Sequence, residues 1–341
     1  MIHRHSAIAH AAYHDLLRLL LDDQVSDLRG TPTKVERSDK IYWYDTYRIG
    51  SSVHKRYIGE DNPQLRDRIA RHKDLTGQRR DRREERSRLV RILRAERFMG
   101  VDAGTGSLMA AMATAGVFRL GGTIVGTHAF RLYEGELGLR YRFDEMAQTG
   151  DIDIASFEQL SLALEDVTLP PLTEVFSGFD FTPVPALEQG KVWRWQQSRS
   201  NQMVEFLTPS FNDEEDLRHL PAFGVEAQAL HHLNYLIASP IPAVVLYRNG
   251  VLLQVPRSER FAIHKLIVSQ RQLGRDVLKS RKDILQAEFL IAALAEDRPD
   301  DLAQAYSQAL AQGPKWRDHI ETALKKAPAI KSHLGGLDIQ L

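Results

Sequence analysis

The segment Gln148-Thr-Gly-Asp-Ile-Asp-Ile-Ala155 carries the pattern that decides the fold of this chain. Side chains alternate between the two faces of a strand, so Asp151 and Asp153 share one face. Ile152 and Ile154 point to the other face, toward a core. Two neighbouring carboxylates repel each other unless cations lie between them. The pattern favours a strand that holds divalent metal ions, and its alternative is a plain strand end that caps a helix.

A second strand, followed by a helix, is predicted upstream. The apolar residues 120–125 lead into Gly126 and Thr127, and residues 127–137 have a helical pattern. Glycine lets the backbone approach a ligand closely, and a helix N-terminus offers N–H groups to phosphate. Gly126 and Thr127 are therefore candidates for nucleotide binding, the alternative being an ordinary turn with Thr127 as the helix N-cap. The glycine spacing fits neither a Walker loop nor a Rossmann motif.

A single acidic residue, Glu205, interrupts the apolar residues 203–207. These residues and residues 192–196 flank a polar turn and are predicted to form a hairpin. Because charged side chains are rarely buried without a partner, Glu205 must face solvent at a sheet edge or join a cluster that requires it. In the second case it would lie beside the strand of Asp151 and Asp153.

Hydrophobic periodicity predicts a chain in three parts whose core is α+β or α/β, and we expect the α+β class. The parts are an N-terminal helix, aromatic β-hairpin and basic helix (1–99), a core of alternating strands and helices (100–256), and a helical C-terminal region (257–341). Within the core, residues 227–237 are predicted to be helical. The apolar runs on either side of Asn249-Gly250 are predicted to form a hairpin, since this dipeptide suits a tight turn. The C-terminal region is predicted to contain four helices, over 261–273, 276–295, 300–311 and 316–325.

Positive charge is concentrated in the N-terminal part. Residues 66–97 contain thirteen Lys and Arg against six Asp and Glu, a local balance of +7 in a chain of zero formal net charge. Together with the aromatic hairpin, this suggests nucleic-acid binding through phosphate contacts and base stacking. The candidate residues are Trp43, Tyr44, Lys55, Arg56, Arg79, Arg80, Arg82 and Arg83. The alternative is a solvated helix with internal ion pairs, beside aromatic residues that cover a small core.

Composition excludes several function classes. The chain has no cysteine, which rules out disulfides, thiolate zinc sites and cysteine nucleophiles. A serine hydrolase is disfavoured because no Gly-x-Ser-x-Gly motif is present. No apolar segment reaches the length of a membrane span or has the pattern of a signal peptide. We therefore expect a soluble cytoplasmic protein with no membrane partner.

Eight short segments, in this order, resemble the nucleotidyltransferase fold of the DNA polymerase β superfamily. More narrowly, they resemble a largely uncharacterised bacterial family of nucleotidyltransferase-like proteins. The segments are Tyr42-Trp-Tyr44, Tyr57-Ile-Gly59, Val125-Gly-Thr-His-Ala-Phe130, Leu137-Gly-Leu-Arg-Tyr141, Thr149-Gly-Asp-Ile-Asp-Ile154, Val204-Glu-Phe-Leu-Thr-Pro209, Phe261-Ala-Ile-His-Lys265 and Lys282-Asp-Ile-Leu-Gln-Ala287.

The resemblance implies an enzyme that uses two Mg²⁺ ions, with Mn²⁺ as an alternative, to transfer a nucleotide from a nucleoside triphosphate such as ATP to an acceptor hydroxyl. By this resemblance, the metal-binding catalytic residues are Asp151, Asp153 and Glu205, and the nucleotide-binding residues are Gly126, Thr127 and Lys265. The sequence departs from the superfamily in two ways. The separation of 25 residues between Gly126 and Asp151 is longer than in compact members, and the third acid is Glu where many relatives have Asp.

The expected acceptor is a nucleic acid, with RNA favoured, while a small-molecule or protein acceptor stays open. A transfer-RNA-modifying, toxin-like enzyme is one specific form of this reading, by analogy with other members of the superfamily. Two alternatives stay open: a non-catalytic nucleic-acid-binding protein on a degenerate nucleotidyltransferase fold, and a metal-dependent nuclease that uses the same carboxylates.

Overall fold

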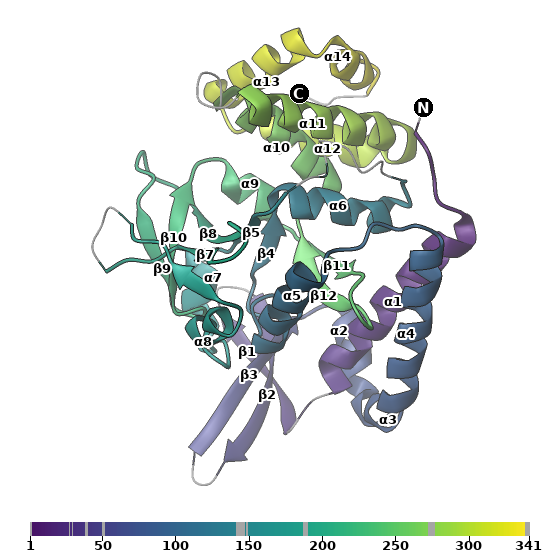
Figure 1. Ribbon diagram of the computed structural model, residues 1–341, viewed down its shortest axis with the longest axis vertical. Coiled ribbons are helices and arrows are strands. Elements are labelled where there is room, and N and C mark those ends of the chain that lie inside the picture. Colours follow the sequence, from purple (N-terminus) through teal and green to yellow (C-terminus); the bar gives the residue numbers. More distant parts are fainter. Residues whose placement is uncertain are drawn as a thin grey trace.

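The computed structural model describes residues 2–26, 28, 30–37, 40–49, 52–140, 147, 149–186, 190–271 and 277–337. It confirms the predicted α+β class, with a mixed sheet at the centre and helices gathered at the C-terminal end (Figure 1). Tyr141 and Gln148 of the quoted motifs lie outside the described residues, as do the predicted helix ends at residues 273 and 276.

The N-terminal part holds a three-stranded antiparallel sheet and four helices. They are α1 (Ala7–Ser26), β1 (Thr31–Arg37), β2 (Lys40–Ile49), β3 (Ser52–Glu60), α2 (Pro63–Ala70), α3 (His72–Gly77) and α4 (Arg79–Ala95). The helix α1 packs its leucines against α4 and against Val244 and Leu246 of the core. The basic helix is thereby fixed to the rest of the molecule by an apolar contact, to which the ion pairs of Arg82 and Arg86 with Asp23 of α1 are added.

The core consists of α5 (Ala103–Ala115), β4 (Thr123–Val125), α6 (Gly126–Leu137), β5 (Ile152–Ala155), α7 (Glu158–Ala163), α8 (Leu172–Ser177), β6 (Phe181–Pro183), β7 (Arg194–Gln197), β8 (Met203–Pro209), β9 (Leu217–Leu220), β10 (Val225–Leu230), α9 (Leu233–Ile237), β11 (Ile241–Val245) and β12 (Val251–Val255). The main sheet has the order β4-β5-β8-β10-β9. On the edge of β8 opposite β5, β7 pairs with the first residues of β8 and β10 pairs with the last ones. Strands β5 and β8 run parallel, so their first residues lie side by side.

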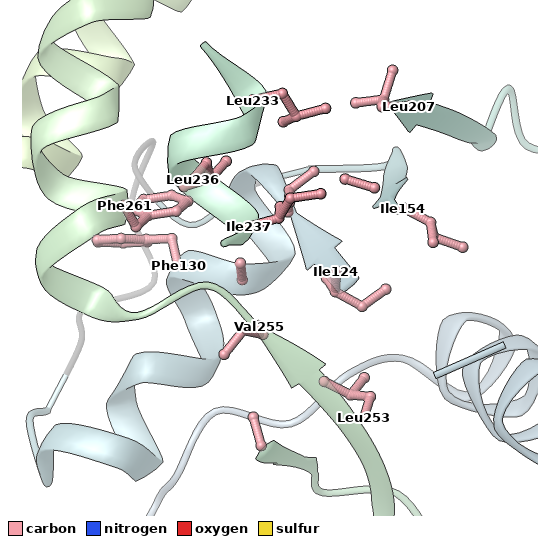
Figure 2. Packing of buried hydrophobic residues seen from close by; sticks show 14 of the residues in the cluster. Ile124, Phe130, Ile154, Leu207, Leu233, Leu236, Ile237, Leu253, Val255 and Phe261 are labelled. Atoms are coloured by element: carbon pink, nitrogen blue, oxygen red, sulfur yellow. The ribbon is translucent and has the colours of Figure 1, made fainter. Parts of the chain in front are cut away.

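The C-terminal helices are α10 (Ser258–Arg271), α11 (Val277–Asp297), α12 (Pro299–Leu310), α13 (Pro314–Lys326) and α14 (Pro328–Gly335). They join the core through aromatic packing, in which Phe130 of α6 stacks on Phe261 of α10 with ring centroids 6.4 Å apart. Figure 2 shows Leu236 and Ile237 of α9 beside this pair. The largest hydrophobic cluster draws residues from all three predicted parts, so the division into separate domains stays a prediction.

The structure corrects the predicted helix over 227–237. Residues Val225–Leu230 form strand β10, in which buried and partly exposed side chains alternate, and α9 begins only at Leu233. Alternation of period two places the alanines at 227 and 229 in the core, which outweighs their helix propensity. A residue with positive φ, His232 at 70°, separates the two elements.

The hairpin around Asn249-Gly250 is confirmed, although its connection spans residues 246–250 rather than two residues. The four predicted C-terminal helices are also present, and α14 is an additional one. Among the described residues, no helix is both long and apolar enough to cross a membrane.

The contact between α6 and α1 allows a test of this packing. A Cβ atom at Gly135 would lie 2.2 Å from Cε2 of Tyr13, whose hydroxyl accepts a hydrogen bond from the Val244 amide. We expect Gly135→Ala to lower the free energy of unfolding by about 1–3 kcal/mol, because overpacking outweighs the gain in helix propensity. Urea unfolding measures the change. The matched control is Gly335→Ala in α14, where a Cβ would meet nothing within 4 Å, and an equal loss there would contradict the packing argument.

Candidate functional site

The parallel pairing of β5 with β8 places Asp153 directly opposite Glu205. Residues opposite each other in a sheet share a face, so both carboxylates project from the same side. Asp151 immediately precedes β5. The structure therefore brings Glu205 to the strand of the paired aspartates, as one sequence alternative required, and we call Asp151, Asp153 and Glu205 the carboxylate cluster.

Strand β7 adds a residue that sequence reasoning missed. Arg194 pairs in register with Glu205 on the side of β8 that faces away from β5. Its Nε is buried and has no hydrogen-bond partner among the described residues, while its guanidinium lies 5.1 Å from the Trp193 ring centroid. Only the strand register reveals this neighbour, because Arg194 belongs to no recognisable motif.

Gly126 closes the other side of the cluster. Val125 of β4 pairs with Asp153, and Gly126 follows with φ of +66° as α6 begins. A Cβ atom at Gly126 would lie 2.4 Å from Oδ2 of Asp153. The backbone therefore passes against the carboxylate at a distance that only glycine permits.

The start of α6 also settles the position of Thr127. Val125 occupies the N-cap position, and no side chain caps this end of the twelve-residue helix. Thr127 thus lies in the first turn and is not the N-cap, which removes its alternative role. The first turn of α6 follows directly on the Asp153 contact of Gly126, in the place where a helix N-terminus favours a negatively charged group.

In the carboxylate cluster, burial and mutual repulsion both disfavour the ionised form of the side chains. Burial raises the pKa of Asp153, and repulsion from Asp151 raises it further. Burial also raises the pKa of Glu205 to about 7, with the charge of Asp153 as the next cause. A divalent cation between these side chains would offset both the burial and the repulsion.

A comparison of donor chemistry with geometry tests whether the residues suit a metal. In the described ranges, no three or more His, Asp or Glu side chains stand close enough together to hold an ion in their present arrangement. The donor set nevertheless consists of carboxylate oxygens, which Mg²⁺ and Mn²⁺ prefer. With Asp153 and Glu205 in register and Asp151 beside them, the chemistry of the cluster fits a divalent cation.

Lysines from the C-terminal helices face the cluster. The charges of Lys279, Lys265 and Lys282 each lower the pKa of Asp153 and so oppose the effect of burial. Of the three, only Lys265 was singled out for phosphate binding in the sequence. Lys279 and Lys282 occupy one face of α11 at a spacing of three residues, a signal that the sequence contains but that needs the fold to be interpreted.

Lys265 itself is committed to an internal contact. It is 8% exposed, and its Nζ donates to Oδ1 of Asp283, which is 2% exposed. Its ammonium also lies 5.2 Å from the Phe261 ring centroid. The pair joins α10 to α11, and it gives Lys265 a structural role that the prediction of phosphate contact did not include.

The predicted nucleic-acid residues fall into two groups. Tyr44 is 1% exposed and its hydroxyl donates to the Leu164 carbonyl, while Arg82 is buried and donates to Asp23 over 2.8 Å. These two cannot contact nucleic acid in this fold, which corrects the prediction for them. Trp43 is partly buried and donates to Asp61.

The other candidates reach the surface. Lys55, Arg79, Arg80 and Arg83 are exposed and Arg56 is partly exposed. Arg80 forms an ion pair of 3.2 Å with Glu84 one turn along α4, as the alternative of a solvated helix implies. Part of the positive charge of residues 66–97 is thus neutralised by ion pairs within the same segment.

Comparison with known proteins gives one match. A family described as nucleotidyltransferase matches residues 103–311, more than half of the chain. This span runs from α5 to the end of α12 and contains the carboxylate cluster, Gly126 and the three lysines. No curated protein and no solved structure matches significantly.

The raised pKa of Glu205 predicts a pH dependence of stability. An acid that holds its proton more tightly when folded destabilises the fold as it ionises. In metal-free protein, we expect the contribution of Glu205 to the free energy of unfolding to fall as the pH rises from 4.5, its ordinary pKa, to about 7. Urea unfolding across this range should show a smaller decline for Glu205→Gln than for the wild type. Identical profiles would mean that Glu205 ionises normally.

Proposed function

The chain belongs to the nucleotidyltransferase family, and we propose that it transfers a nucleotide from a nucleoside triphosphate to an acceptor hydroxyl, with the metal chemistry of the DNA polymerase β superfamily. The observation that carries the proposal is the strand register that sets Asp153 against Glu205, with the backbone of Gly126 against the same carboxylate. Carboxylates beside a glycine at a helix start supply both a cation site and a phosphate site.

In this proposal Asp151, Asp153 and Glu205 would hold two Mg²⁺ ions. When bound, such ions offset phosphate charge and lower the pKa of the acceptor hydroxyl. The acceptor oxygen forms a bond to the α-phosphorus as the bond to the bridging oxygen breaks, and pyrophosphate leaves. The hydroxyl proton passes to solvent, so no side-chain base is required.

The other residues of the site position the triphosphate. The backbone N–H groups at Gly126 and Thr127 would bind it at the start of α6, which no side chain caps and where Gly126 adds no side chain against Asp153. Lys279 and Lys282 place positive charge on the side of α11 that acts on Asp153, where it would attract the negative tail of the triphosphate. Lys265 of α10 forms an ion pair with Asp283 of α11, the helix that carries Lys279 and Lys282, and is therefore a positioning residue.

We propose a nucleic acid as the acceptor, RNA in the first instance. The exposed cations of the N-terminal part support this proposal, since phosphate contacts dominate the affinity of such complexes. The experiment that tests the function incubates the protein with each labelled triphosphate, Mg²⁺ and RNA. Label on the RNA with release of pyrophosphate supports transfer. Cleavage of the RNA would indicate a nuclease, and binding without either reaction a non-catalytic protein.

Removal of single charges tests the cluster. We expect Asp151→Asn and Asp153→Asn to fold normally and to lose transfer by more than about 100-fold, because even residues that only support metal ligands contribute about 10–100-fold. Transfer is measured as pyrophosphate release. Asp318→Asn, at an exposed acid on α13, is the control and should keep full activity. Wild-type rates in either cluster variant would remove that residue from the proposed site.

Gly126→Ala tests the phosphate site separately. The added Cβ would collide with the Asp153 carboxylate and displace it, so we expect loss of metal-dependent triphosphate binding in calorimetry. The positive φ adds a cost of about 1–2 kcal/mol in stability. Gly224→Ala is the matched control, since Gly224 has φ of +63° and nothing within 4 Å of a Cβ. Unchanged triphosphate affinity in folded Gly126→Ala would refute the assignment.

A further inference from the structure

A second concave site lies apart from the carboxylate cluster. A cavity of about 1000 Å³ is lined by side chains from α1, β2, β3, α4, α5 and the β11–β12 connection. None of its lining residues belongs to the carboxylate cluster. In Figure 1 the β2–β3 hairpin and the C-terminal helices stand at opposite ends of the molecule. We call this cavity the basic groove.

Positive charge dominates the walls of the basic groove. Six cationic side chains line it against two carboxylates, those of Asp23 and Asp166. The cationic residues are Lys55, Arg56, Arg79, Arg86, Arg119 and Arg248. This excess occurs in a chain of zero formal net charge, so it is a local property of the groove.

The two acids are occupied by neighbours. Asp23 pairs with Arg86 over 2.9 Å, and Asp166 pairs with Arg119. Lys55 and Arg248 are both exposed, and within the described ranges neither forms an ion pair. The groove therefore has two cations without an ion pair among the described residues. Lys55 lies on β3 and Arg248 on the β11–β12 connection, which are far apart in the sequence.

Flat and apolar surfaces lie between these cations. Tyr47 stacks on His54 with the rings 15° from parallel, and both line the groove. The guanidinium of Arg248 lies 5.2 Å from the Tyr247 ring centroid. Aromatic faces beside cations are the surfaces on which single-stranded nucleic acids bind, since bases stack on rings while phosphates contact Lys and Arg.

We propose that the basic groove binds a single-stranded nucleic-acid segment, with its phosphodiesters on Lys55, Arg56 and Arg248 and its bases against Tyr47 and Tyr247. The concave shape excludes a flat lipid surface. The spread of six cations over several elements suits a chain of phosphates better than one mononucleotide. If the segment belongs to the acceptor, the groove holds it at a distance from the reacting hydroxyl, and only this last step rests on the proposed function.

The test measures binding by fluorescence anisotropy of labelled single-stranded RNA and DNA of the same length. The variant Lys55→Ala/Arg248→Ala removes two groove cations that have no ion pair to break. Each lost phosphate contact lowers the salt slope of log K by about 0.7 for single strands, so we expect a decrease of about 1.4 together with weaker binding at low salt. Full-length protein is used throughout.

The matched control is Lys315→Ala/Lys325→Ala, which removes the same charge from exposed positions of α13 that do not line the groove. We expect it to keep the wild-type affinity and slope. An equal loss in the control would mean that overall charge alone sets the affinity, and no loss in the groove variant would place the binding outside the groove; either result would overturn the proposal. Absence of wild-type binding to either nucleic acid would also overturn it.

Two further measurements separate this proposal from the proposed function. Asp153→Asn should bind the labelled strand as the wild type does, because the groove does not involve the carboxylates. The groove variant should keep its affinity for a free triphosphate. If transfer activity is absent altogether, strand binding by wild-type and Asp153→Asn protein still supports the groove. A difference between the RNA and DNA arms identifies which nucleic acid the groove prefers.

Discussion

The site depends on one constraint, the parallel pairing of β5 with β8. These strands lie far apart in sequence, and their register alone sets Asp153 opposite Glu205. A shift by one residue would turn one of the acids into the apolar layer, where Ile154 and Phe206 are fully buried. Burial of the isoleucines and the phenylalanine on one face therefore fixes the register of the two strands. The register in turn determines which carboxylates are neighbours on the other face.

Charged residues surround this pair of strands on both sides. Asp153 has Gly126 on one side and Glu205 on the other, and Glu205 is followed by Arg194 on β7. Cations from α10 and α11 approach the same carboxylates, although Lys265 is neutralised by Asp283. A negative centre flanked by cations on two elements can accept both a metal ion and the phosphate chain bound to it.

Local patterns in the sequence predicted what depends on local structure. Alternation around Asp151 and Asp153 predicted their strand, and the glycine before the helix predicted the close backbone approach at Gly126. Such patterns do not predict which elements pack side by side. Arg194 and Lys279 carry no motif, and only strand register and helix packing bring them to the site. The helix predicted over 227–237 was wrong because burial of alternate residues outweighed the helix propensity of alanine and produced β10. Tyr44 and Arg82 had the residue types of a binding surface, yet packing made them part of the interior.

The position of α1 has a consequence for how the chain is made. Tyr13 contacts Val244 across a separation of 231 residues, and Leu16 and Leu20 share that apolar cluster. During synthesis the ribosome delivers α1 long before β11 and β12 emerge, so its leucines have α4 as a partner but lack the hairpin. Contacts of this range form late and slow folding, and they leave apolar surface exposed meanwhile. The nascent N-terminal part therefore keeps this apolar surface exposed until β11 and β12 have been synthesised.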